Sequence, residues 1–304
     1  MDKLKATRFF LKLSETLSFK ETAAYYGVPA STVSRSLKNL EENLGVTLVE
    51  RTTRRIRLTE AGQWYRSEIS GPIRALANAD EMVHAQSQNP SGTLHITALT
   101  GYGEQRLFPA LEKFRIQHPQ IICDVHLTDS YLDLSTGEVD IAIRATADPP
   151  EYLVAKRLHG NRWGLVASPR YIAKHGRPQS YSDIENHASI GFRGPRGLMP
   201  WLAKKTNGEV VDIARNPTFI TNHGLQILHA TIAGEGLSFL PIWGVSKSIA
   251  AGQLEEITLE DSEIIFSTGP EMSMYLLYDP SKARLGKMNA MVDFLRAELT
   301  SDKF

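Results

Sequence analysis

Several features that define other protein classes are missing from this sequence of 304 residues. It contains one cysteine, Cys123, so an internal disulfide framework and a cysteine-rich zinc site are both excluded. No apolar run approaches the roughly 18 residues that a membrane-spanning helix needs. The opening stretch MDKLKATRFF has no long apolar region followed by a small-residue cleavage site. We therefore expect a cytoplasmic protein without a membrane partner.

The sequence motifs of common enzyme classes are also missing. No GxSxG or HExxH motif occurs, and the nine histidines do not cluster at metal-ligand spacing. The run Gly101-Tyr102-Gly103 lacks the remaining glycine of a dinucleotide fingerprint and is typical of a tight turn. We predict no catalytic residue, no metal ligand and no resident cofactor. Cys123 lies in an apolar run that predicts a buried strand, where a thiol is inert.

The net charge is zero, but the charge is unevenly distributed. Residues 1–66 hold 12 Lys and Arg against 7 Asp and Glu, a net charge of +5. The remaining residues hold 22 against 27, a net charge of −5. A basic head on an acidic body is typical of a modular protein that binds nucleic acid.

Residues 18–62 contain the strongest pattern in the chain. Val33, Leu37, Leu40 and Leu44 recur at steps of four, three and four, which places them on one apolar face of a helix. The opposite stripe carries hydroxyl and cationic groups, namely Ser31, Ser34, Arg35 and Lys38. A helix with one buried face and one polar face is free to contact a partner through the polar side.

The residues before this helix predict a second helix and a sharp turn. Ser18 suits an N-cap, with Glu21 at the capping-box distance. Ala23 and Gly27 allow two helices to approach closely, and Pro29 suits the start of the next helix. After Gly45, two short alternating runs flank the sequence RTTR and predict a basic hairpin. Together these features predict a winged helix-turn-helix that places its second helix in the DNA major groove.

A long helical pattern begins after Thr59, a suitable N-cap, and continues to about residue 86. Its apolar positions form a narrow seam that suits pairing with a second copy of the chain. Gly71-Pro72 interrupts the seam, and we expect a kink there rather than a break. The residues assigned to dimerisation are Tyr65, Ile69, Ile73, Leu76 and Val83.

Beyond the polar stretch QSQNPSG, strand and helix patterns alternate. Strands are predicted at 94–98, 121–127, 140–144, 163–167, 189–192, 236–241 and 272–278, and helices at 106–118, 225–233 and 283–299. This alternation is typical of parallel α/β units. We predict two similar α/β subdomains with a cleft between them.

The same residues resemble the LysR-type transcriptional regulators along essentially the whole chain. The most specific similarity is in SF, AA, VSR, LE, LG, RTTR and LTEAG between residues 18 and 62, and RTTR resembles one large subgroup of the family. Weaker similarity continues in Phe108-Pro109, in DIAIR at 140–144 and in AGEGLSFLP at 233–241. Many relatives have Ser and then Gln or Lys where this chain has Pro29 and Ala30. Ala30 can still contact a thymine methyl group.

The resemblance implies a multidomain fold. Its parts are an all-α winged helix-turn-helix, a dimerising linker helix and an α/β effector-binding domain of two Rossmann-like subdomains, as in periplasmic binding proteins. We assign residues 1–58, 59–88 and 92–304 to these parts. Subdomain I covers about 92–162 and 267–304, and subdomain II about 163–266. The implied assembly is a homo-oligomer, a dimer of dimers on paired half-sites of double-stranded DNA, with RNA polymerase as a further candidate partner.

The candidate DNA-binding residues come from the predicted second helix and from the wing. Arg35 suits a bidentate contact with guanine, Lys38 suits phosphate, and the wing arginines suit the backbone or a narrow minor groove. The full set is Ser18, Ala30, Ser31, Thr32, Ser34, Arg35, Lys38, Arg51, Thr53, Arg54 and Arg55.

Candidate effector-binding residues follow from a rule of α/β folds, in which ligands bind at the carboxyl ends of strands and near helix N-termini. The set is Leu99, Thr100, Gly101, Tyr102, Asp129, Arg144, Phe192, Arg193, Gly194, Asn222, His223 and Gly224. Two arginines and several backbone N–H groups suggest a small organic anion as the effector.

The predicted function is therefore sequence-specific transcriptional regulation, in which a small molecule in the cleft modulates DNA binding or bending. Two alternatives stay open at this point. One is an architectural DNA-binding protein that needs no ligand. The other is an enzyme whose α/β body is localised by the DNA-binding head, although no catalytic motif supports it.

Overall fold

The structure is a computed structural model that describes residues 2–51, 56–84, 90–130, 138–194 and 196–300. The chain divides into two compact units, Met1–Gln88 with Asp133–Asp140 and Asn89–Leu132 with Ile141–Phe304. Within the described ranges, no helix has the length and apolarity needed to span a bilayer.

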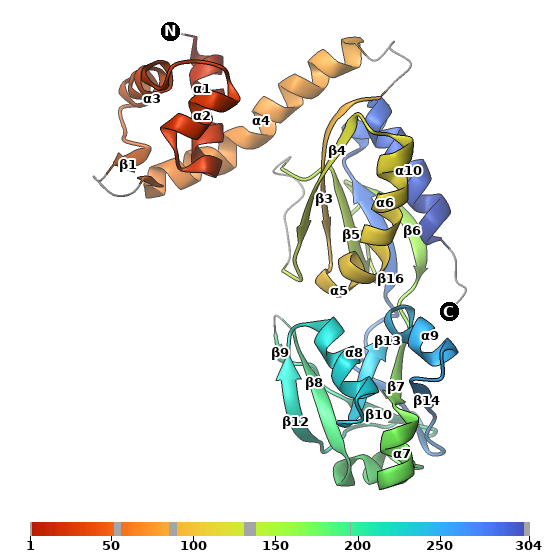
Figure 1. The fold of residues 1–304 in the computed structure, drawn as a ribbon. Helices are drawn as coiled ribbons and strands as arrows, with labels where there is room; N and C mark the ends of the chain where they lie inside the picture. The colour runs from red at the N-terminus through yellow and green to blue at the C-terminus, as the bar shows by residue number, and fades with distance from the viewer. Residues whose placement is uncertain (1, 52–55, 85–89, 131–137, 195, 301–304) are drawn as a thin grey trace. The chain divides into compact units, whose positions relative to one another are not determined.

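The N-terminal unit has the predicted order of helices and hairpin (Figure 1). Its elements are α1 (Lys3–Thr16), α2 (Phe19–Tyr25), α3 (Ala30–Leu44), β1 (Val49–Arg51), β2 (Ile56–Leu58) and α4 (Glu60–His84). Ser18 caps α2 as predicted, because its hydroxyl oxygen accepts the backbone N–H of Glu21 at 3.2 Å. Gly45 ends α3 in the left-handed conformation, at φ 72°, which favours glycine.

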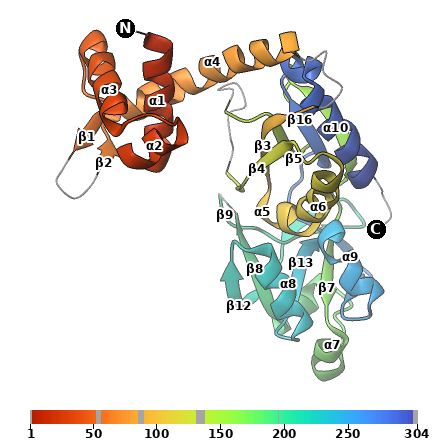
Figure 2. The same ribbon diagram turned by 45° about the horizontal axis from the view of Figure 1, so that its top comes forward.

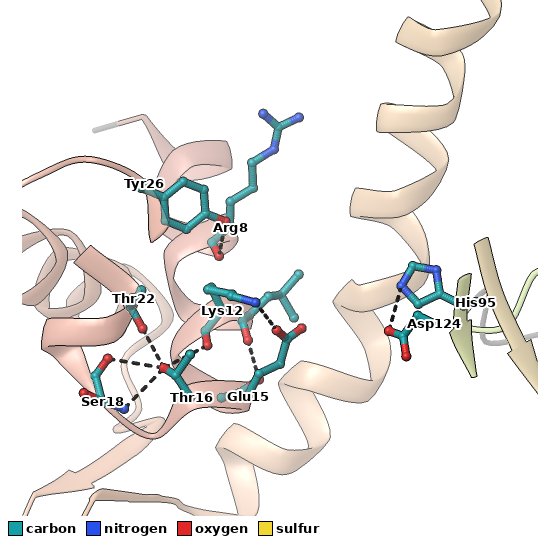
Figure 3. Close-up of polar contacts among 11 residues, drawn as sticks. Arg8, Lys12, Glu15, Thr16, Ser18, Thr22, Tyr26, His95 and Asp124 are labelled. Carbon is teal, nitrogen blue, oxygen red and sulfur yellow. Dashed lines mark hydrogen bonds and ion pairs between the residues drawn. The ribbon is translucent and has the colours of Figure 1, made fainter. Parts of the chain in front are cut away.

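The core of this unit is built from the apolar stripes of α1 and α3. Phe10 and Leu13 of α1 pack with Leu37 and Leu40 of α3, and all four are fully buried. Hydrogen bonds around Thr16 join α1 to α2, since its hydroxyl lies 2.8 Å from that of Thr22 (Figure 3). The predicted core face of α3 is therefore confirmed, and its opposite face is left outside the core.

The hairpin and α4 meet at a close backbone contact. Glu41 Oε1 accepts the backbone N–H groups of Leu48 and Val49, at 2.8 and 3.1 Å, and so fixes the chain between α3 and β1. A Cβ atom on Gly62 would lie 2.1 Å from the carbonyl oxygen of Leu48. Gly62 is required there because any side chain would push the first turn of α4 away from the hairpin.

Helix α4 is continuous from Glu60 to His84 and includes Pro72. A break at Gly71-Pro72 is excluded, as expected from the sequence. Thr59 caps the helix as predicted, because its hydroxyl oxygen accepts the N–H of Gly62 at 2.9 Å.

The second unit begins with a mixed sheet in the order β4-β3-β5-β16-β6. Its strands are β3 (Gly92–Ala98), β4 (Ile121–Leu127), β5 (Ile141–Thr146), β6 (Val154–Gly160) and β16 (Ser273–Tyr278). Strands β3, β4 and β5 are parallel, whereas β16 runs antiparallel to β5 and β6. The parallel α/β units expected from the alternation are present in β3, β4 and β5, whereas the antiparallel direction of β16 was not predicted.

Helices cover one face of this sheet (Figure 2). They are α5 (Thr100–Tyr102), η1 (Gly103–Leu107), α6 (Phe108–Gln117), η4 (Pro280–Arg284) and α10 (Gly286–Leu299). Phe114 of α6 and Leu295 of α10 share one core with Ile96 and Ile143 of the sheet. The segment η1 is a single π-helical turn, an irregularity that is frequent at functional sites.

The second subdomain has a sheet in the order β12-β8-β13-β7-β14, with β9 paired to β8. Its elements are β7 (Trp163–Ala167), α7 (Pro169–His175), η3 (Tyr181–Asn186), β8 (Ala188–Gly194), β9 (Gly197–Leu198), β12 (Asn216–Thr221), α8 (Gly224–Ile232), β13 (Leu237–Pro241), α9 (Ile242–Ala250) and β14 (Glu255–Ile257). Strands β12, β8 and β13 are parallel, so their carboxyl ends share one edge, and α8 and α9 begin there.

A small antiparallel sheet, β11-β10-β15, was not predicted. It contains β10 (Leu202–Lys205), β11 (Val210–Asp212) and β15 (Ser262–Ile265). The Asn207-Gly208 turn between β10 and β11 is a common hairpin signal and marks this hairpin in the sequence. The strand β15 is distant in sequence, so its pairing with β10 depends on the tertiary fold.

Cys123 lies in β4, which is an edge strand of its sheet, and its side chain is half-buried. The strand is confirmed but its full burial was wrong, because one neighbour is missing at a sheet edge. Partial burial still raises the pKa of the Cys123 thiol, which disfavours the reactive thiolate.

Candidate DNA interface and effector cleft

The polar face of α3 is open to solvent. Ala30, Ser31, Arg35 and Lys38 are exposed, whereas Val33, between them in the sequence, is completely buried. The Lys38 ammonium lies 3.6 Å from the carboxylate of Glu42, one turn later, and both side chains are mostly exposed. An exposed pair of this kind contributes about 0.5 kcal/mol or less, so DNA phosphate can displace Glu42 at little cost.

The remaining DNA-binding candidates lie at the edges of this face. Thr32 and Ser34 are half-buried, and Ser18 is engaged as the α2 cap described above. Thr53, Arg54 and Arg55 fall outside the described residues, as does the side chain of Arg51.

The base of the wing is ordered by strand pairing and one ion pair. In the β1–β2 ladder Glu50 lies opposite Arg57, and Glu50 Oε2 accepts a hydrogen bond from Arg57 Nε at 2.6 Å. This pair joins the two strands at the base of the hairpin.

The predicted dimerisation residues of α4 differ in how far their side chains are buried. Tyr65 packs inside the N-terminal unit, with its ring centroid 5.5 Å from that of Phe10. Its contribution to a dimer seam therefore needs revision, since the side chain is engaged within its own chain. Ile69 and Ile73 are half-exposed and Leu76 is 41% exposed, while the side chain of Val83 is outside the described residues.

In the effector-binding domain, three neighbouring strand ends meet beside a half-buried arginine. Asp129, just beyond β4, accepts the backbone N–H of Thr100 at 3.0 Å. Arg144 of β5 donates from Nη2 to the hydroxyl of Thr97 at 2.8 Å and from Nη1 to its own neighbouring carbonyl, Ile143, at 2.9 Å. Burial lowers the pKa of Arg144 to about 10, although Asp129 acts in the opposite direction. The guanidinium is thus partly desolvated and bonded to neutral groups.

One of the predicted effector contacts is placed elsewhere. Tyr102 is completely buried, and its hydroxyl bonds to His159 Nε2 at 3.0 Å. Because His159 Nδ1 faces the carbonyl oxygen of Gly160 at 2.7 Å, the ring proton is on Nδ1 and Tyr102 is the donor. Tyr102 is therefore a core residue, which corrects its assignment to the cleft wall. Arg193 is exposed in the β8–β9 hairpin, and its contact with an effector stays a prediction.

The other subdomain II candidates lie around the start of α8. Phe192, at the end of β8, is half-buried against the apolar core beneath α8 and is paired with Thr221 of β12. His223 is the N-cap residue of α8, and Gly224 is the first residue of that helix, whereas Asn222 is exposed. Leu99, Thr100, Gly101 and Gly194 are half-exposed at the corresponding strand ends.

Residues that sequence reasoning missed join the two subdomains. His223 Nε2 lies 3.3 Å from Oε1 of Glu104, which belongs to η1 of subdomain I. Trp243 of α9 stacks edge-to-face on Tyr102 at 4.9 Å and packs into the subdomain I core. The indole N–H of Trp243 also donates to Asn161, between β6 and β7, at 2.7 Å. The sequence signal available for Trp243 was a large apolar residue just after a predicted strand. No sequence pattern pointed to Glu104.

The family comparisons agree with this architecture. The chain matches the family model of the bacterial regulatory helix-turn-helix protein, lysR family, over residues 4–63. It matches the model of the LysR substrate binding domain over residues 87–300. The chain therefore belongs to the LysR family of transcriptional regulators, with an N-terminal DNA-binding domain and a C-terminal effector-binding domain.

Individual relatives extend over nearly the whole chain. It is 32% identical to an HTH-type transcriptional regulator of Xanthomonas campestris pv. campestris, over 98% of this chain and 86% of that protein. The solved structure of CrgA, a LysR-type transcriptional regulator from Neisseria meningitidis, aligns with a TM-score of 0.62 at 30% identity and covers 99% of both chains. A full-length variant of OxyR from Pseudomonas aeruginosa, at 18% identity and a TM-score of 0.70, shares the fold over 98% of this chain and 96% of that one.

Proposed function

We propose that this LysR-type regulator reads paired half-sites of double-stranded DNA with the exposed face of α3, and that a small organic anion bound in the α/β cleft controls this reading. The observation that carries the DNA part is the contrast on α3 between exposed Arg35 and Lys38 and buried Val33 and Leu37. Such a helix can enter the major groove without disturbing its own core.

A homo-oligomer fits this proposal. Two copies joined along α4 would present two α3 helices to successive half-sites, and two such dimers would grip adjacent sites. The partly exposed apolar residues Ile69, Ile73 and Leu76 support pairing along the helix. This arrangement gives the effector domain a mechanical route to the DNA, because a change in domain arrangement would alter the spacing of the two α3 helices.

Arg35→Ala tests the DNA part. We expect about a tenfold loss of affinity for the specific operator, because a bidentate arginine–guanine contact is worth about 1–3 kcal/mol. Binding to a scrambled duplex should change little, as measured by gel shift at one salt concentration. Equal losses on both duplexes would make Arg35 a phosphate contact instead. Footprinting separates regulation from architecture, since uniform coverage without discrete half-sites would support the architectural alternative.

The effector part rests on Arg144. A guanidinium that is partly removed from water and bonded to neutral partners gains from an incoming anion, since its hydrogen bonds to an anion are stronger than those to neutral groups. The open ends of β3, β4 and β5 surround it, which is where ligands of such sheets bind.

Calorimetry of the full chain with small organic acids tests this site, with Arg144→Ala as the variant. We expect binding to the natural chain and at least a tenfold weaker affinity in the variant. Arg170→Ala, on an exposed position of α7, is the matched control and should leave the affinity unchanged. Equal binding by all three proteins would contradict the anion site.

A further inference from the structure

Glu104 and His223 make a polar contact between the two subdomains. Glu104 lies in η1, directly after α5, and His223 lies directly before α8. The 3.3 Å contact joins Glu104 Oε1 to His223 Nε2, so the second polar atom of each side chain is left for another partner.

Those two second atoms are buried and unsatisfied. Glu104 Oε2 and His223 Nδ1 have less than 1 Å² of exposed surface each, and no hydrogen-bond partner is found for them among the described residues. A carboxylate oxygen only accepts hydrogen bonds. When His223 donates from Nε2 to Glu104, the neutral ring leaves Nδ1 as an acceptor as well. Both atoms therefore require a hydrogen-bond donor, and buried polar groups rarely lack one in folded proteins.

The backbone on both sides of this pair is open. A Cβ atom on Gly101, in α5, or on Gly224, in α8, would meet no atom within 4 Å in the part of the chain that the structure describes. The first turn of α8 also receives no side-chain cap from its N-cap residue, His223. Two buried polar atoms without a partner among the described residues, one from each subdomain, are groups that a bound ligand would satisfy.

We propose that Glu104 and His223 form a donor-binding subsite of the effector cleft. It receives a hydroxyl or amino group of an organic acid whose anionic group is held by Arg144, and this inference rests on the proposed function above. The effector class is thereby narrowed from organic anions in general to acids that also carry a hydrogen-bond donor. Because the subsite has one wall from each subdomain, such a donor would also join the two subdomains.

A matched ligand series tests the subsite on the full-length protein. Propionate, lactate and alanine share one carbon skeleton and differ only in carrying hydrogen, hydroxyl or ammonium at carbon 2. Ligand-observed NMR titration at millimolar concentration gives the three affinities. We expect lactate and alanine to bind about tenfold more tightly than propionate, as for one hydrogen bond to a charged group.

Variants at Glu104 assign the difference to this side chain. In Glu104→Ala the three acids should bind equally. In Glu104→Gln, which keeps an accepting oxygen but no charge, lactate should keep part of its advantage and alanine should lose most of it. Glu112→Gln, an exposed glutamate of α6, is the control and should keep the natural pattern. If Glu104→Ala does not fold, as judged by its unfolding transition, Glu104→Gln carries the test alone.

Three results would overturn the subsite, and they separate it from the anion site. If propionate binds through Arg144 but lactate and alanine gain nothing, the subsite fails and the anion site stands. If the gain persists in Glu104→Ala, the donor binds elsewhere. If none of the three acids binds the natural chain, both the subsite and the anion site are contradicted.

Discussion

Helix α3 and the effector-binding domain around Arg144 present their polar groups in opposite ways. On α3 the cations are exposed, and the contact of Lys38 with Glu42 is a loose surface pair. In the effector-binding domain, hydrogen bonds hold the side chain of Arg144, which is half-buried, and that of His159, which is fully buried. Polar groups in water can be exchanged without much effect on folding, whereas buried ones contribute to stability and function together. Substitutions on the exposed face of α3 should therefore change DNA binding without changing stability. Substitutions of buried polar groups in the effector-binding domain should change function and stability together.

The largest expected effect is that of Gly236→Ala, before β13. A Cβ atom there would lie 2.6 Å from the carbonyl oxygen of Ala188, a backbone atom that cannot move aside. We expect a loss of about 3 kcal/mol in the free energy of unfolding, measured by urea denaturation. Gly224→Ala, which meets open space among the described residues, is the control and should be neutral or slightly stabilising.

A smaller effect is expected for Tyr102→Phe. The change removes the hydroxyl that donates to buried His159 Nε2 and leaves that atom without this donor. The cost should be about 1.5 kcal/mol in the free energy of unfolding. The same substitution at Tyr25, which is 65% exposed, should cost less than about 0.5 kcal/mol. Equal effects at both positions would remove the contrast between buried and exposed polar groups.

Lys38→Ala examines the other side of the comparison. If Lys38 contacts phosphate, its loss should reduce the slope of log affinity against log salt concentration by about one, for operator and scrambled DNA alike. The free energy of unfolding should change by less than about 0.5 kcal/mol. Lys247→Ala, on an exposed position of α9, should leave both quantities unchanged. A large loss of stability in Lys38→Ala would show that α3 is not an independent surface.

The smallest effect is a pH dependence that arises at His187. Burial lowers the pKa of this ring, and nearby His175 adds to the shift while Asp183 opposes it. The unfolded chain therefore takes up a proton that the folded ring resists, so stability should fall as the pH decreases through about 6.5. His187→Gln should flatten the dependence of the urea midpoint between pH 8 and pH 5. The same change at exposed His126 should leave the slope as it is.

The success of sequence reasoning differs between the two regions for a physical reason. The helix boundaries and core face of α3 follow from contacts between residues three or four apart, which the sequence displays directly. Seven of the fourteen strands described in the effector-binding domain were also predicted, among them β4 and β7, which are short apolar runs with clear ends. The wrong assignment of Tyr102 to the cleft has a different reason. Residues near a strand end can face either the core or the cleft, and an aromatic side chain suits both places.

Pairings between distant segments were beyond local patterns. The pairing of β15 with β10 and that of β16 with β5 join segments more than 50 residues apart. The assignment of residues 267–304 to subdomain I came from the family resemblance and not from a local pattern. The contact of Glu104 with His223 spans a long separation as well and crosses from one subdomain to the other. No periodicity encodes such contacts.

The sequence by itself determined the modular order of this protein, its family and the polar face of α3 that lies outside the core, because these depend on local spacing and on charge gathered in one segment. Only the tertiary structure decided which polar groups are buried, that Tyr102 belongs to the core, and that Glu104 meets His223. Burial and pairing are properties of how distant segments pack. Burial lowers the pKa of Arg144, and it leaves Glu104 Oε2 without a hydrogen-bond partner among the described residues.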